Sequence, residues 1–125
     1  MRILMVLVWV LLGTACTSRG AANRYMDSAY ESYAGGDCQS ALLALSQAER
    51  MGRPGNGMQP EISLLRGNCL ERQGLYVDAA QTYRFIQSRF PYSEYAWRAK
   101  ARLDTLQQLG YLRMGEPAIV WPAPR

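Results

Sequence analysis

Side chains that commonly carry enzyme chemistry are scarce in this chain. The 125 residues include no His, three Cys and ten Asp or Glu. Because His is the commonest general base, no Ser or Cys has the usual partner that would activate it as a nucleophile. The carboxylates are scattered among basic neighbours, so no pair stands out as a general acid and base. We therefore expect the protein not to be an enzyme, and we expect no cofactor and no small-molecule substrate.

The first cysteine follows a segment that is typical of export signals. Arg2 supplies a positive charge, and residues 3–12 form an unbroken apolar run. Ten helical residues span about 15 Å, only half of the hydrocarbon core of a bilayer. The run therefore fits a signal peptide over residues 1–15 better than a membrane span. Small residues at 13–15 then lead directly to Cys16.

A Cys that directly follows such small residues resembles the bacterial lipobox. The resemblance implies that Cys16 carries acyl chains such as palmitate and becomes the mature N-terminus. Thr17 follows Cys16 where an inner-membrane protein would carry Asp, so the resemblance implies a lipid anchor at the outer membrane, on its periplasmic face. Several acyl chains, at about 0.8 kcal/mol per buried CH₂, would hold the protein firmly. The alternative is ordinary signal-peptidase cleavage near Ala15, which would give a soluble periplasmic protein.

A tether, a set of helices and a tail are predicted after the signal peptide. Residues 16–22 are small and polar, which predicts a short tether. Apolar residues at helical spacing, interrupted by Gly and Pro, then predict five helices within residues 23–110. The predicted helices start near Asn23, after Asp37, after Pro60, near Tyr76 and near Ser93. Residues 111–125 contain three Pro and no helical period, which predicts a tail that is extended or disordered, or that lies back on the domain through Ile119, Val120 and Trp121.

The predicted helices contain an internal repeat. Small, Gly, small and bulky residues recur at an offset of 38, as Ala29, Gly36, Ala41 and Leu45 and again as Gly67, Gly74, Ala79 and Tyr83. With Pro91, the second set resembles the tetratricopeptide-repeat family, whose unit is a helix–turn–helix. The resemblance implies an all-α fold with two repeats and a capping helix, which begins a third copy with Trp97 four residues before Ala101. A generic bundle of four or five helices is the alternative.

The two other cysteines, Cys38 and Cys69, fall on helices that such a stack would make antiparallel neighbours. An exported protein meets an oxidising compartment, so the resemblance implies a Cys38–Cys69 disulfide. Closing a loop of about thirty residues would stabilise the fold by roughly 3 kcal/mol. The alternative is a pair of buried free thiols. Two Cys without His are too few ligands for a metal.

The resemblance also implies a groove for a partner, formed by the first helix of each repeat. Family geometry places on it Met26, Tyr30, Tyr33, Leu64, Asn68, Arg72, Tyr95, Arg98 and Arg102. Tyr, Asn and Arg suit adaptable peptide binding. Arg98, Lys100 and Arg102 make the last helix basic, which favours an acidic partner, lipid head groups or an anionic polysaccharide. The alternative is that these side chains are merely solvated.

Residues 84–106 also resemble repeats in bacterial envelope lipoproteins, such as the outer-membrane assembly lipoprotein and the Tol–Pal coordinator. The resemblance implies a protein-binding adaptor that serves an envelope assembly, secretion or polysaccharide-export complex. The net charge of +4 is modest, so we expect no nucleic-acid partner. The alternative function is a structural accessory subunit that docks on a larger envelope complex through its C-terminal tail.

Overall fold

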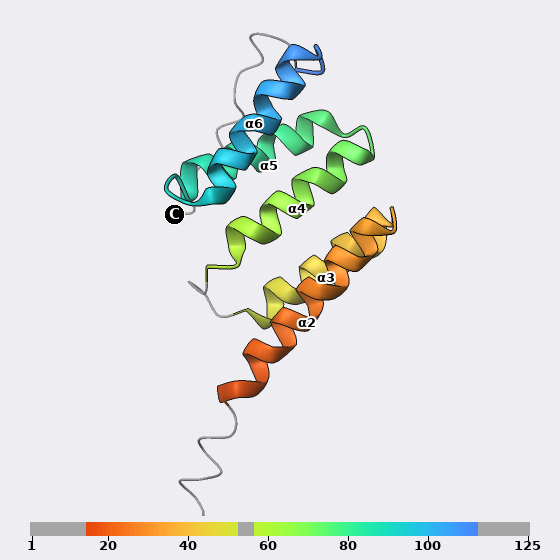
Figure 1. Ribbon diagram of the computed structural model, residues 1–125, viewed down its shortest axis with the longest axis vertical. Helices are drawn as coiled ribbons and strands as arrows, with labels where there is room; N and C mark the ends of the chain where they lie inside the picture. Colours follow the sequence, from red (N-terminus) through yellow and green to blue (C-terminus); the bar gives the residue numbers. More distant parts are fainter. Residues whose placement is uncertain (1–14, 53–56, 113–125) are drawn as a thin grey trace, which may run out of the picture.

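The computed structural model describes residues 15–52 and 57–112, and side chains from residue 20 onward (Figure 1). These residues form five helices and no strand, which confirms the predicted all-α class. The helices are α2 (Ala15–Ala34), α3 (Cys38–Met51), α4 (Gln59–Arg72), α5 (Tyr76–Arg89) and α6 (Glu94–Gln108). The predicted signal peptide before Ala15, the side chain of Cys16 and the tail from residue 113 lie outside the described residues.

Helix α2 begins at Ala15, eight residues before the predicted start at Asn23. Residues 16–22, predicted as a tether, are therefore helical. Three Ala in residues 15–22 favour a helix and no Pro interrupts it. Ala22 is buried in the core, so the last of these turns is held by packing as well as by propensity. Helix α4 also begins slightly early, at Gln59, with Pro60 in its first turn, where Pro is tolerated.

The helix ends follow the predicted stop and start residues. Gly36, Gly74 and Gly110 each have φ between 77° and 83°, the left-handed conformation that ends a helix at little cost only for Gly. The Asp37 carboxylate accepts from the Ser40 N–H at 2.9 Å, and the Ser93 hydroxyl accepts from the Ala96 N–H at 3.2 Å. These contacts cap the two helices that were predicted to start after Asp37 and near Ser93.

The helices pack as consecutive antiparallel neighbours. Helix α2 packs on α3, α3 on α4, α4 on α5 and α5 on α6, while α4 also contacts α2 and α6. Figure 1 shows α4 in the middle, between the α2–α3 pair and the α5–α6 pair. Helices α2, α4 and α6 therefore lie beside one another along one side of the molecule.

Two apolar clusters fill the interior. One joins α2, α3 and α4 through Met26, Ala29, Ala44, Leu45, Ala48, Ile62 and Leu65. The other joins α4, α5 and α6 through Leu64, Ala79, Ala80, Tyr83, Ile86, Ala96, Ala99, Leu103 and Leu106. Both clusters take residues from α4, so this helix belongs to both halves of the core.

Small residues are buried at the contacts between paired helices. Ala29 of α2 and Ala41 of α3 are fully buried. In α4, a Cβ atom on Gly67 would lie 2.9 Å from Cζ of Tyr83 and still closer to its Cε1. The ring of Tyr83 therefore occupies the space that any side chain at residue 67 would need.

Candidate functional site

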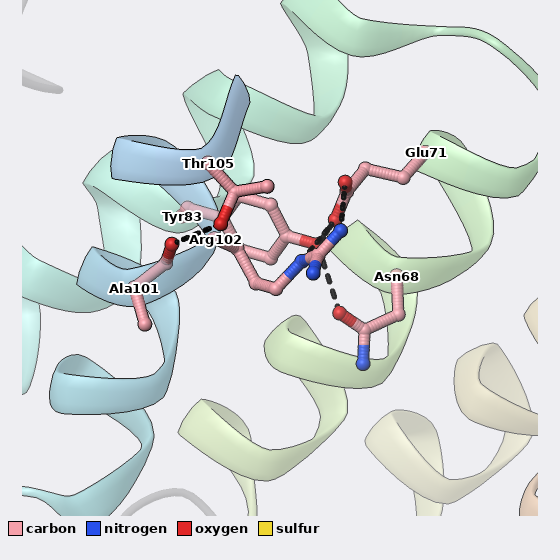
Figure 2. A network of polar contacts seen from close by, with 6 residues as sticks. All are labelled: Asn68, Glu71, Tyr83, Ala101, Arg102 and Thr105. Carbon is pink, nitrogen blue, oxygen red and sulfur yellow. Dashed lines mark hydrogen bonds and ion pairs between the residues drawn. The ribbon is translucent and has the colours of Figure 1, made fainter. Parts of the chain in front are cut away.

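A polar network ties the last three helices together on the α4–α6 side (Figure 2). From α6, Arg102 donates to both carboxylate oxygens of Glu71 on α4, at 2.6 and 2.9 Å. From α5, the Tyr83 hydroxyl lies 2.5 Å from Glu71 Oε2 and 2.8 Å from Asn68 Oδ1. The carboxylate has no proton to give, so Tyr83 is the donor in its contact with Glu71. The bidentate Arg–carboxylate pair is the strong form of an ion pair.

Charges in this network shift the pKa values of its members. Burial raises the pKa of Glu71, whose side chain is 10% exposed, but the hydrogen bonds from Arg102 and Tyr83 outweigh burial and hold the pKa below its ordinary value. Burial and the neighbouring Glu71 carboxylate both raise the pKa of Tyr83. Glu71 is therefore ionised and Tyr83 is protonated near neutral pH.

Replacing Glu71 by Gln is expected to lower the free energy of unfolding at pH 7 by about 1–2 kcal/mol, because hydrogen bonds to a charged group are stronger than neutral ones. The folded-state pKa of Glu71 lies below its ordinary value of 4.5. The wild-type protein therefore has this stability above pH 4.5 and loses it as the pH falls through the folded-state pKa. Urea unfolding at pH 7 and at about pH 3 should show the difference between the two proteins shrinking at acid pH.

Asp104→Asn is the matched control for this substitution. Asp104 pairs with Lys100 at 2.8 Å, but both side chains are about half exposed, so the pair should contribute no more than about 0.5 kcal/mol. Equal losses for the two substitutions at pH 7 would contradict the role given to Glu71.

Aromatic and cationic side chains connect the first helices elsewhere on the same side. The Arg72 guanidinium lies 3.6 Å from the centroid of the Tyr33 ring and donates to the Tyr33 carbonyl at 2.6 Å. The Tyr30 hydroxyl donates to Glu61 Oε1 at 2.7 Å. The structure therefore brings predicted residues of α2 next to α4.

The α6 end of this surface has a looser arrangement. Arg98 lies with its guanidinium carbon 5.9 Å from the centroid of the Tyr95 ring. Tyr95 is half-buried and Arg98 is exposed. Within residues 20–52 and 57–112, Arg98 makes no ion pair.

Met26 and Leu64 correct the predicted groove, because both are core residues, 5% and 4% exposed. They lie 38 residues apart in the sequence, and each belongs to one of the two apolar clusters, Met26 to the first and Leu64 to the second. Each side chain is covered by packing within its cluster and cannot contact a partner. The remaining predicted residues on this side are Tyr30, Tyr33, Asn68, Arg72, Tyr95, Arg98 and Arg102, all exposed or half-buried.

Glu61 and Glu71 were not predicted as part of this surface. Each accepts a hydrogen bond from a predicted residue on another helix, Glu61 from Tyr30 and Glu71 from Arg102, in both cases across 31 positions of the sequence. The helical period places these carboxylates near the predicted face, but only the packing of neighbouring first helices identifies their partners. Several of the seven predicted residues are thus connected to a neighbouring helix by hydrogen bonds.

Cys38 and Cys69 lie in one small buried cluster with Ala41. Both are free thiols in the structure. Burial, together with a hydrogen bond to Cys38, raises the pKa of Cys69 to about 12, so this thiol is protonated and unreactive near neutral pH. The structure thus brings together the two residues of the predicted disulfide, and the bond itself stays a prediction.

Comparison of the chain with protein-family models, with curated proteins and with solved structures gave no match. In the part of the chain that the structure describes, no group of three or more His, Cys, Asp or Glu is placed to hold a metal ion. No described helix is both long and apolar enough to cross a membrane. The side formed by α2, α4 and α6 carries exposed Tyr30, Arg72 and Arg98, together with half-buried Tyr33 and Tyr95.

Proposed function

We propose that the protein is a non-enzymatic adaptor that binds a protein partner through the surface formed by α2, α4 and α6. The observation that carries the proposal is the row of aromatic and cationic side chains along these three helices. Tyr30 and Arg72 are exposed on α2 and α4, and Arg98 is exposed on α6 without an ion pair in the described residues. Tyr and Arg are the residue types that most often dominate binding energy at interfaces.

Charge favours an acidic segment as the bound part of the partner. Glu61 and Glu71 on this surface accept hydrogen bonds from Tyr30 and Arg102, while Arg98 keeps its charge exposed. An acidic peptide would pair with Arg98 and stack against Tyr95, which lies beside it.

The proposal includes a tetratricopeptide-like architecture. Matching environments at positions 38 residues apart support it: Gly36 and Gly74 share the left-handed conformation, and Ala41 and Ala79 are both fully buried. Two helical hairpins followed by a capping helix would present their first helices on one side, as the proposed binding mode requires.

We further propose that Cys16 anchors the protein to the outer membrane and that the partner belongs to a cell-envelope complex. The apolar run at residues 3–12 and the small residues before Cys16 support this location. Helix α2 begins at Ala15, so the folded domain would start directly at the anchored residue, close to the membrane surface.

Chemical crosslinking in envelope preparations, followed by affinity capture and mass spectrometry, tests the binding surface. The variant Tyr30→Ala with Arg98→Ala should lose a crosslinked protein that the wild type retains, because it removes an exposed aromatic and the unpaired cation. Leu43→Ala with Arg84→Ala is the matched control, since both residues are exposed on α3 and α5, and it should retain that protein.

A chain truncated after Leu112 separates the two candidate functions. The truncation keeps Leu112 packed on the core and removes only residues 113–125. Retention of the crosslinked protein by this chain supports the adaptor. Loss of that protein with the truncation alone, and not with Tyr30→Ala and Arg98→Ala, would refute the binding surface and favour the structural subunit that docks through its tail.

A further inference from the structure

One face of α6 is uncovered where the corresponding faces of α2 and α4 are covered. Gly67 of α4 lies against the Tyr83 ring of α5, and Ala29 of α2 is fully buried in the cluster shared with α3. The matching residue of α6 is Ala101, which lies 34 residues after Gly67, and it is exposed. Trp97, one turn earlier on the same face, is 72% exposed.

A shallow groove runs beside this face. It is lined by Gln87 and Pro91 at the end of α5 and by Ala96, Trp97 and Lys100 of α6. Its floor and the exposed Trp97 ring are apolar. Within the described residues nothing covers the groove, so a large aromatic ring is left in water at one end of the molecule.

The path of the chain after α6 indicates what covers this face. The Tyr111 N–H donates to the Leu106 carbonyl at 3.0 Å, just as Asp37 donates to Ser32 and Leu75 donates to Leu70, each at 2.9 Å. After the turn at residue 36 the chain returns along α2 as α3. After the turn at residue 74 it returns along α4 as α5. The turn at Gly110 has the same left-handed φ of 77°, so it directs the chain back along α6.

The last described residues already follow this return path. The Tyr111 ring stacks on the Tyr76 ring of α5, with centroids 3.9 Å apart. Leu112 packs against the apolar cluster of α4, α5 and α6. The chain therefore leaves the described part on the α5 side of α6.

We propose that residues 113–125 lie back over the Trp97–Ala101 face as an extended strap, in the place that α3 and α5 take on the other helices. Three Pro within these residues oppose a helix. The way back from Leu112 to Trp97 is about 22 Å at helical rise, and these residues reach about 40 Å when extended. Ile119, Val120 and Trp121 supply apolar side chains at the right distance to fill the groove.

Charge disfavours a second copy of the chain as the occupant. Of the cations beside the exposed face, Lys100 is paired with Asp104 and Arg102 with Glu71, so only Arg98 lacks an ion pair in residues 20–52 and 57–112. Two such faces brought together around a twofold axis would bring the unpaired Arg98 of each copy toward the same interface. The strap carries two Arg and one Glu over residues 113–125, and its Glu116 can approach Arg98.

Oxidative footprinting read by mass spectrometry tests the strap, because it reports on Trp97 separately from Trp9 and Trp121. In the full chain, Trp97 should be oxidised about threefold more slowly than in a chain truncated after Leu112, since covering an exposed ring protects it. Circular dichroism of both chains establishes that the helices are retained. Equal oxidation rates in two folded chains would overturn the proposal.

A matched pair of lysine substitutions in the full chain tests the contact surface. Ala101→Lys places a charge under the strap and should raise the oxidation of Trp97 to the level of the truncated chain. Gln107→Lys adds the same charge to an exposed residue on another face of α6 and should leave Trp97 protected. Protection of Trp97 that is lost on dilution would overturn the strap and assign the face to a second copy of the chain. Protection that survives Ala101→Lys would overturn it too, because the tail would then not contact the face at Ala101.

Discussion

Replacing Tyr83 by alanine is expected to lower the free energy of unfolding by about 3–5 kcal/mol, the usual cost of truncating a large buried aromatic. Tyr83 has no exposed surface and is the largest fully buried side chain among residues 20–52 and 57–112. Its ring fills the space over Gly67, and its hydroxyl donates to the Glu71 carboxylate. The substitution therefore creates a cavity and also removes one donor from a buried anion. Urea unfolding followed by circular dichroism measures the loss.

Tyr92→Ala is the control for this prediction, because the same side chain is 99% exposed at that position and its removal should change stability by less than about 0.5 kcal/mol. Tyr83→Phe isolates the hydroxyl and should cost about 1–2 kcal/mol, less than the loss of the whole ring. Similar losses for Tyr83→Ala and Tyr92→Ala would contradict the packing of the α4–α5 pair.

Replacing Gly67 by alanine should destabilise the protein even though Ala favours helices. The helical preference of Ala over Gly would contribute about 1 kcal/mol of stability. The added methyl group would overlap the Tyr83 ring, and overpacking of a closed core costs about 1–3 kcal/mol. The ring cannot move away easily, because its hydroxyl donates a hydrogen bond to the Glu71 carboxylate. We expect a net loss of up to about 2 kcal/mol in urea unfolding.

Gly20→Ala is the matched helical control. A Cβ atom at Gly20 meets nothing within 4 Å, so this substitution should raise stability by up to about 1 kcal/mol. Combining Gly67→Ala with Tyr83→Leu should cost less than the sum of the two single substitutions, because the smaller side chain makes room for the methyl group. A stabilised Gly67→Ala protein, or strict additivity, would refute the close contact.

Local sequence signals were sufficient to predict most of the helices. Gly36 and Gly74 end α2 and α4 because only Gly takes their backbone conformation without strain. Asp37 and Ser93 mark the starts of α3 and α6 because their side chains accept hydrogen bonds from free N–H groups. Each of these signals acts within a few residues, and for that reason it can be recognised without knowledge of the packing.

Features that depend on packing between helices were predicted less well. The resemblance to the tetratricopeptide-repeat family placed Met26 and Leu64 in the binding groove, but both are buried within the apolar clusters, which depends on how the helices of this chain pack. The early start of α2 at Ala15 was missed because small residues carry no apolar period. The Glu71–Arg102 pair was missed because its partners lie 31 positions apart.

The carboxylate of Glu71 also determines which part of the chain opens as a unit. It belongs to α4, and it is held by Tyr83 from α5 and by Arg102 from α6. If α6 alone detached, Glu71 would lose both hydrogen bonds from Arg102 in addition to the apolar contacts of α6, and a bidentate, charged pair of this kind is stronger than a neutral hydrogen bond. Fraying from the C-terminal end should therefore stop before α6 separates, and α4, α5 and α6 should exchange their amide hydrogens through one shared opening.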